Sequence, residues 1–214
     1  MSLKAVLFDL DGVLLDTEGI YTDFWSDIDR RFPTGVDNFA AVIKGNTLSN
    51  ILATYFPDNA IQAHIHRLLI DQELNMPYRM FPGALDLVEG LRDAGINTAI
   101  VTSSTLAKMK NVFRTLPRLE NAIDTLVTDE DVTASKPDPQ GYLIAARRLK
   151  AAPGEFIVVE DSMAGLEAGR RAGAFVVGIA TTNPMDAVTP ACHFAVDAIA
   201  RLTPEGLLNV FQSH

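Results

Sequence analysis

The stretch KAVLFDLDG, residues 4–12, places a short apolar run directly before two aspartates and a glycine. A nearly continuous apolar run of this length is typical of a strand that is buried on both faces of a parallel sheet. The aspartates and the glycine that follow the run indicate a turn. We therefore predict a buried strand at residues 4–8, with Asp9 and Asp11 at its carboxyl end.

Four later runs have the same character. They are short and rich in valine and isoleucine, and helical stretches lie between most of them. Two of these helices, residues 83–94 and 162–172, are followed by a glycine, the residue that most often ends a helix in the left-handed conformation. The alternation predicts an α/β fold, with a doubly wound, Rossmann-like parallel sheet and helices on both faces. The further strands are expected at residues 96–101, 123–127, 155–159 and 174–179.

The segment between about residues 17 and 80 has a different pattern, because it contains no run of the buried-strand type. Its apolar residues recur at helical spacing, as in Ile61, Ile65 and Leu68. We predict a helical insertion at residues 17–80 and a sheet domain formed by residues 1–16 and 81–214.

The composition limits the classes of function. The chain has 214 residues, 48% of them hydrophobic, which is enough apolar material for a packed core. Its net charge of −9 repels polyanions, so we expect no nucleic-acid partner. No apolar run approaches the roughly 20 residues of a membrane span, so we expect no membrane partner. The first apolar run stops at Asp9, too soon for a signal peptide, and Cys192 is the lone cysteine. We expect a cytoplasmic monomer.

Polar residues follow the predicted strands, at the sheet edge where function collects in parallel sheets. If these strand ends meet, four carboxylates, hydroxyl groups and a lysine share one site. Carboxylates a few ångströms apart repel each other strongly in a partly dry site and therefore require a cation. Oxygen ligands favour a hard ion, and we predict Mg²⁺ as the cofactor. The residues are Asp9, Asp11, Thr102, Ser103, Ser104, Lys136, Glu160 and Asp161.

Such a site suits a phosphate ester, because the metal, Lys136 and the helix N-terminus near Ser103 provide local positive potential. Asp9 and Asp11 are two residues apart at a strand end, so their side chains point the same way. One can attack phosphorus while the other transfers protons. The sequence therefore predicts phosphoryl transfer from a small phosphorylated metabolite.

Four short motifs follow one another along the chain: Phe8-Asp9-Leu10-Asp11-Gly12-Val13, Thr102 after a strand, Lys136-Pro137-Asp138-Pro139, and Glu160-Asp161-Ser162. In order and spacing they resemble the motifs of the haloacid dehalogenase superfamily, and the match covers nearly the whole chain. The helical insertion after the first motif is similar to the small helical cap of the β-phosphoglucomutase-like phosphatases. The resemblance implies the same α/β core with residues 17–80 as a cap.

The resemblance also implies catalytic roles. Asp9 is then the nucleophile that forms an aspartyl-phosphate, and Asp11 is the acid that protonates the leaving oxygen and afterwards activates water. Thr102 holds phosphoryl oxygens, and Lys136 neutralises charge between the phosphate and Asp9.

The remaining site residues are implied in the same way. One carboxylate oxygen of Asp9, the backbone carbonyl of Asp11, and Asp161 with Glu160 nearby hold Mg²⁺. The cap supplies leaving-group specificity in this family. The residues implied to contact the substrate are Ser103, Ser104, Lys44, Gly45 and Asn46.

Two enzymatic outcomes fit this pattern, hydrolysis of a sugar phosphate and a β-phosphoglucomutase-type isomerisation. Relatives that act as mutases usually carry a His where this chain has Tyr21, an Arg where it has Leu48, and a Lys-Asn pair where it has Thr105-Leu106. A mutase must hold a second phosphate, and cations for that task are absent from these positions. We therefore favour hydrolysis.

Two more classes of protein share part of the pattern. A dehalogenase has the Asp nucleophile but needs neither a metal nor Asp11, and a signalling receiver uses similar residues without a helical insertion. Taken singly, the motif residues also have structural explanations as turn and capping residues. We interpret Tyr21 and Trp25 as core of the insertion, and His64 and His66 as surface residues.

Overall fold

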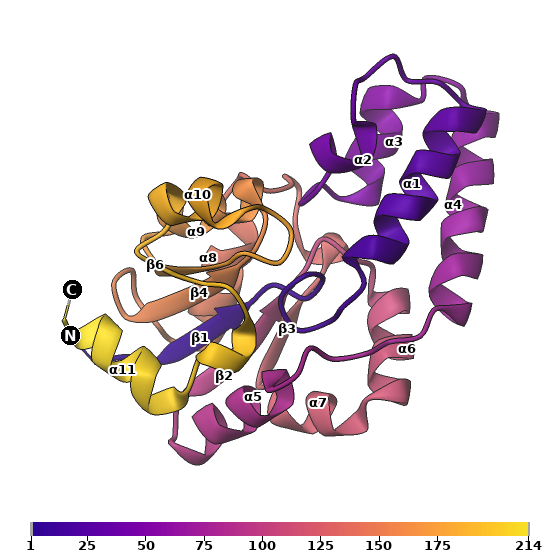
Figure 1. Cartoon of the computed structure of the whole chain (residues 1–214). Helices are drawn as coiled ribbons and strands as arrows, with labels where there is room; N and C mark the ends of the chain where they lie inside the picture. Colours follow the sequence, from indigo (N-terminus) through magenta and orange to yellow (C-terminus); the bar gives the residue numbers. More distant parts are fainter. Residues whose placement is uncertain (1, 214) are drawn as a thin grey trace.

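The chain folds around a parallel sheet of six strands within residues 2–213, the part that the computed structural model describes (Figure 1). The strand order is β3-β2-β1-β4-β5-β6, and all neighbouring strands pair in parallel. This order and the helices on both faces make the fold the predicted doubly wound α/β class. The strands are β1 Ala5–Phe8, β2 Asn97–Val101, β3 Thr125–Val127, β4 Phe156–Glu160, β5 Phe175–Ile179 and β6 Phe194–Val196.

The five predicted strands are confirmed to within two residues at each end. The edge strand β6 was not predicted, because its apolar residues lie between His193 and Asp197 and form no longer run, and Phe194 is exposed. Strand β3 is equally short, but it lies within the longer predicted run 123–127. Gly95 and Gly173 both have positive φ angles, of 74° and 76°, as the predicted helix ends require.

The central strand β1 is buried on both faces, and all four of its residues are 0% exposed. Val6 and Phe8 belong to an apolar cluster that packs against α5, α6, α7 and α11. Ala5 and Leu7 point to the other face, where α8 and α9 pack. An uninterrupted apolar run was therefore necessary for a strand in this position.

The connections and the outer layers are helical. The longer helices are α1 Glu18–Arg31, α3 Leu48–Tyr55, α4 Asn59–Asn75, α5 Ala84–Asp93, α6 Leu106–Thr115, α8 Gln140–Arg148, α9 Met163–Arg171 and α11 Pro204–Gln212. The shorter ones are α2 Phe39–Val42, α7 Pro117–Ala122, α10 Met185–Val188 and the 3₁₀ turns η1 Asp129–Asp131, η2 Thr189–Ala191 and η3 Ile199–Arg201.

Helices α1 to α4 form a separate group beside the sheet, seen at the upper right of Figure 1. They pack around an apolar cluster of their own, which includes Trp25, Ile28, Phe39 and Ile65. Trp25 therefore lies in the core of the insertion, as its position predicted. Figure 1 shows the group beyond the carboxyl end of β1, on the side where the strand points.

The two segments that connect this helical group to the sheet run side by side. The backbone N–H of Asp16 donates to the carbonyl of Arg79, and that of Phe81 donates to the carbonyl of Leu14. The places where the chain enters and leaves the helical group are therefore joined by backbone hydrogen bonds.

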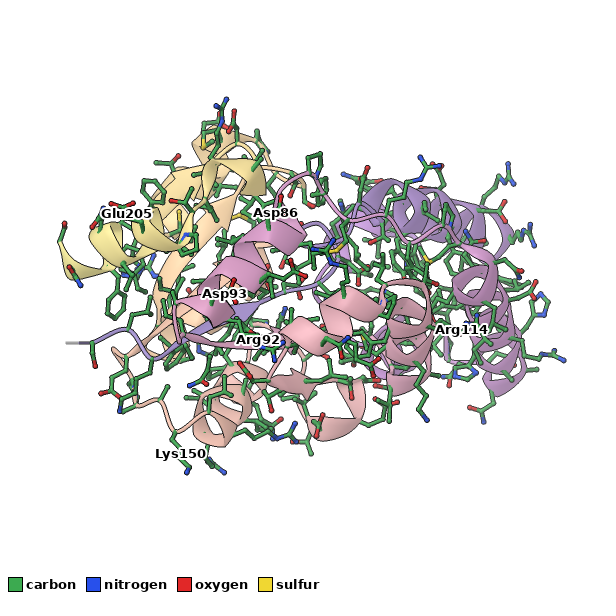
Figure 2. All side chains as sticks on the ribbon, turned by 90° about the horizontal axis from the view of Figure 1, so that it is seen from below. Asp86, Arg92, Asp93, Arg114, Lys150 and Glu205 are labelled. Carbon is green, nitrogen blue, oxygen red and sulfur yellow. The ribbon has the colours of Figure 1, made fainter. Side chains whose placement is uncertain are left out.

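The outer surface of the sheet layer carries charged residues. Asp86 and Asp93 of α5 and Glu205 of α11 lie on the outside of these helices (Figure 2). Among residues 2–213, no helix combines the length and the apolar character that crossing a bilayer requires.

Helix α9 packs so closely that it tolerates no side chain at Gly165. A Cβ atom there would lie 1.7 Å from Oε1 of the buried Glu160. We expect Gly165→Ala to lower the free energy of unfolding by about 1–3 kcal/mol, because the buried carboxylate must shift. Urea unfolding measures this. Gly19→Ala in α1 is the matched control, since a Cβ there meets nothing within 4 Å, and an equal loss in both variants would contradict the packing argument.

Candidate active site

The carboxyl ends of β1, β2 and β4 bring the predicted residues together. Asp9 follows β1, Thr102 follows β2, and Glu160 ends β4. The strands are in register, since Phe8 pairs with both Ile100 and Val159. Polar residues one or two positions beyond these pairs therefore meet at one edge of the sheet.

Lys136 is the cation at the centre of this edge and is only 8% exposed. Its Nζ lies 2.5 Å from Asp9 Oδ1 and 2.6 Å from Glu160 Oε1, and it also donates to the carbonyl of Val101. Burial works to lower the pKa of Lys136, but the charges of Asp9 and Glu160 overcome it and hold this pKa well above its ordinary value. The lysine therefore stays charged between the two carboxylates.

Glu160 has both carboxylate oxygens engaged. Oε1 accepts hydrogen bonds from Lys136 and from the hydroxyl of Tyr142, and Oε2 accepts from the backbone N–H groups of Asp161 and Ser162 and from Ser162 Oγ. Burial acts to raise the pKa of Glu160, but Lys136 and these donors bring it below its ordinary value. Glu160 is therefore a fixed anion that orients Lys136.

Asp9, Glu160 and Asp161 form an acidic cluster in which one carboxylate oxygen of each residue lies within 4.8 Å of the other two. Burial, together with the charges of Glu160 and Asp11, raises the pKa of Asp9 to about 8 against the opposing charge of Lys136. Burial and the same kind of repulsion raise the pKa of Asp161 well above its ordinary value. An all-oxygen cluster with this repulsion has the donor chemistry of a hard divalent cation site.

The loop after β5 supports Asp161, a role that was not predicted. Thr182 Oγ1 donates to the Asp161 carboxylate, and Asn183 Nδ2 donates to its carbonyl at 2.9 Å. Gly12 passes so close that a Cβ would lie 2.1 Å from Asp161 Oδ2. The sequence did contain one indication of this role, because Thr182 and Asn183 follow a predicted strand, as the predicted site residues do.

Asp11 faces the same opening as Asp9 but has different partners. Its carboxylate accepts hydrogen bonds from Thr17 Oγ1, from Ser104 Oγ at 3.1 Å and from Lys108 Nζ at 2.7 Å. Ser104 also donates its backbone N–H to Thr102 Oγ1. The two aspartates are thus held independently, Asp9 by Lys136 and Asp11 by this second group.

Lys108 was not predicted as a site residue. In the structure its side chain is fully buried. It lies on α6, which Thr105 caps by accepting from the Lys108 N–H, and its Nζ is 4.6 Å from the centre of the Tyr21 ring. The absence of a Lys-Asn pair at Thr105-Leu106 suggested that this region lacks a cation, whereas a lysine three residues further along reaches the site. Helical spacing could have indicated this burial, because Lys108 lies on the same inward face of α6 as Met109 and Val112.

The helical group closes over these residues. Ser103 Oγ donates to the carbonyl of Gly45, and Thr47 forms hydrogen bonds with Ser135 through its N–H and its hydroxyl. Lys44 forms an ion pair with Glu18 at 2.6 Å. Together the two parts of the molecule enclose a cavity of about 120 Å³.

The cavity is lined by most of the predicted site residues. Lys136 and Glu160 are the exceptions, because they lie behind Asp9. The predicted residues that line it are Asp9, Asp11, Lys44, Gly45, Asn46, Thr102, Ser103, Ser104 and Asp161. Tyr21 also lines the cavity while packing against the core of the helical group.

Known proteins resemble this chain in sequence and in fold. The family model of the haloacid dehalogenase-like hydrolases matches residues 3–173. Hexitol phosphatase A of Escherichia coli is 35% identical over 185 residues, which cover 84% of each chain. Validoxylamine A 7′-phosphate phosphatase of Streptomyces hygroscopicus subsp. limoneus is 31% identical over 196 residues, which cover 88% of this chain and 91% of the relative.

A solved structure has the same fold. The β-phosphoglucomutase of Clostridium difficile superposes with a TM-score of 0.78, covering 99% of this chain and 98% of its own at 21% identity, a likeness of fold. Site and sequence together define a hydrolase of phosphoric monoesters, an enzyme of the phosphatase class. The chain belongs to the haloacid dehalogenase-like hydrolase family.

Lys108 gives a test of how Asp11 is held. We expect Lys108→Met to lower kcat about a hundredfold, because Asp11 loses its cationic partner and its fixed orientation. Turnover of p-nitrophenyl phosphate measures the effect. Lys110→Met changes an exposed lysine of the same helix and should leave kcat unchanged. A rate within twofold of the wild type for Lys108→Met would mean that Thr17 and Ser104 suffice to position Asp11.

Proposed function

We propose that this chain hydrolyses a small phosphorylated carbohydrate, with Mg²⁺ as cofactor and Asp9 as nucleophile. The observation that carries the proposal is the pair Asp9 and Asp11, which line one cavity and are held by separate partners. The relatives support the substrate class, since one is named a hexitol phosphatase.

The two aspartates have different roles, Asp9 as the nucleophile and Asp11 as the group that transfers protons. A carboxylate oxygen of Asp9 attacks phosphorus while the bond from phosphorus to the leaving oxygen breaks, and Asp11 donates a proton to that oxygen. Asp11 then accepts a proton from the water that attacks the aspartyl-phosphate. This second attack breaks the bond between Asp9 and phosphorus and releases inorganic phosphate. Thr102 and the backbone of Ser103 hold the phosphoryl oxygens.

Asp9 and Asp161 are the carboxylates best able to hold Mg²⁺, with the backbone carbonyl of Asp11. Glu160 is a member of the same acidic cluster, and since both its oxygens already accept hydrogen bonds, it contributes mainly charge and the orientation of Lys136. When bound, the metal supplies positive charge that offsets the charge of the phosphoryl oxygens. Lys136 supplies the second positive charge next to Asp9.

We propose residues 17–80 as the cap that covers the leaving group. This assignment is supported by the separate apolar cluster of α1–α4 and by the hydrogen bonds that join Gly45 and Thr47 to the sheet domain. Lys44 and Asn46 line the cavity and are candidate contacts to the leaving group, together with Gly45, Ser103 and Ser104.

Hydrolysis is favoured over a mutase reaction by the partners of the lysines. Lys44 is paired with Glu18 and Lys108 with Asp11, and Leu48 adds apolar surface to the cavity. A mutase needs cations that are free to hold a second phosphate. The lysines around this cavity are already neutralised within the chain.

Replacement of the nucleophile tests the proposal. We expect Asp9→Asn to lower kcat on phosphomonoesters at least about a thousandfold while the unfolding curve stays close to that of the wild type. The assay follows phosphate release from a panel of phosphorylated sugars and from p-nitrophenyl phosphate with Mg²⁺. Asp93→Asn, an exposed carboxylate on α5, is the control and should keep full activity.

Two outcomes would contradict the proposal. A phosphate adduct found by mass spectrometry of the acid-quenched protein at a residue other than Asp9 would remove the nucleophile assignment. Efficient conversion of β-glucose 1-phosphate to glucose 6-phosphate, without phosphate release, would identify the protein as a mutase.

The pKa of Asp9 makes a prediction for metal binding. Because this pKa is about 8 in the metal-free protein, Mg²⁺ must displace a proton below that pH. The apparent affinity for Mg²⁺ should therefore rise with pH, by at least about tenfold per unit between roughly pH 6 and pH 8, because the pKa of Asp161 is raised as well and its proton must also be displaced. Isothermal titration calorimetry in buffers of different ionisation enthalpy measures both affinity and proton release. A constant affinity over this range would show that Asp9 is already ionised without the metal.

A further inference from the structure

The part of the cavity away from Asp9 is formed by the helical group. Its wall is largely apolar, with Trp25, Ile43, Leu48, Ile51 and Leu69 among the lining residues. This is the space next to the phosphate site, where a leaving group would lie. The polar residues that interrupt the apolar wall are Glu18, Tyr21, Thr22, Lys44, Asn46 and Glu73.

Glu73 is the unusual residue of this wall, a carboxylate on α4 that is only 8% exposed. Its Oε1 accepts a hydrogen bond from the hydroxyl of Tyr21 at 2.9 Å. Within residues 2–213 no group donates a hydrogen bond to its Oε2. Because Glu73 lines the cavity and its Oε2 has no donor within the described chain, Oε2 is an acceptor available to a ligand there.

The position of Glu73 is fixed from two sides. Its backbone carbonyl accepts from the hydroxyl of Tyr78 at 2.6 Å, near the end of α4. Burial and the neighbouring carboxylates raise the pKa of Tyr21 well above its ordinary value, so its hydroxyl stays protonated and donates to Glu73. Tyr21 therefore holds the carboxylate of Glu73, and Tyr78 holds the backbone at the same residue.

No cation forms an ion pair with Glu73 in the described part of the chain. Lys44 is paired with Glu18, and Lys108, which lies over the Tyr21 ring, is bound to Asp11 and Ser104. The charges within each of these two ion pairs offset each other, whereas the negative charge of Glu73 has no cationic partner in the described chain. Burial raises the pKa of Glu73, and the nearby charge of Lys108 opposes this shift.

We propose that Glu73 selects the leaving group by its charge, accepting a hydrogen bond from a hydroxyl of an uncharged polyol or sugar and rejecting a carboxylate or a second phosphate. This inference rests on the proposed function and narrows its substrate class to monophosphates of neutral polyhydroxylated compounds. Like charges placed together in a desolvated site are a strong source of discrimination. The apolar wall adds no cation that could offset the repulsion.

Matched substrate pairs test the proposal. Glycerol 3-phosphate and 3-phosphoglycerate differ by one change from CH₂OH to carboxylate, as do sorbitol 6-phosphate and 6-phosphogluconate. With Mg²⁺, we expect the wild type to favour the neutral member of each pair at least about tenfold in kcat/KM. Glu73→Gln keeps an acceptor for Tyr21 but removes the charge, and it should narrow this ratio about tenfold, mainly through KM.

The control and the contrary outcomes are distinct. Asp71→Asn makes the same change at an exposed position of the same helix and should leave the ratio unchanged. A general loosening of the cap would lower both members of a pair together and leave their ratio as in the wild type. An unchanged ratio in Glu73→Gln, or equal use of both members by the wild type, overturns the role of Glu73 while phosphatase activity remains. Absence of turnover on every phosphomonoester, p-nitrophenyl phosphate included, overturns the proposed function as well.

Discussion

The buried ammonium group of Lys136, placed between Asp9 and Glu160, is the interaction on which the site depends. Without it, two carboxylates and Asp161 would face one another in a region that excludes water, a costly arrangement. Glu160 can hold the lysine because Tyr142 and Ser162 satisfy its remaining lone pairs. Gly165 in the first turn of α9 leaves room for the Glu160 carboxylate, since a Cβ there would collide with it, and this glycine therefore also supports the position of Lys136.

The helical group acts on this site through few contacts. It is tethered where Leu14 and Asp16 pair with the returning segment, and it meets the sheet domain again through Gly45 and Thr47. Between these points α1 and α4 contribute Tyr21 and Glu73 to the cavity wall. A small group of helices can thus shape the leaving-group space without altering the residues that meet the phosphate.

The sequence was sufficient for what depends on local pattern. Apolar runs predicted five of the strands, and polar residues at their ends predicted which side chains meet, as seen for Asp9, Thr102 and Asp161. Lys108 and Glu73 were missed because their importance arises from the packing of a helix against a distant segment, and α4 has no sequence signal for which face meets the cavity. Strand β6 was missed because its apolar residues are confined between His193 and Asp197 and form no longer run.

The balance of charge in the site explains why a metal belongs there. The acidic side chains in or directly behind the cavity are Asp9, Asp11, Glu18, Glu73, Glu160 and Asp161, and the lysines bound to them are Lys44, Lys108 and Lys136. Six carboxylates against three lysines leave a formal excess of three negative charges. In the metal-free protein, protonation relieves part of this excess, as the raised pKa values of Asp9 and Asp161 indicate. A phosphate dianion would add to the excess, whereas a divalent cation replaces the protons and lets Asp9 face phosphorus as the carboxylate that attack requires.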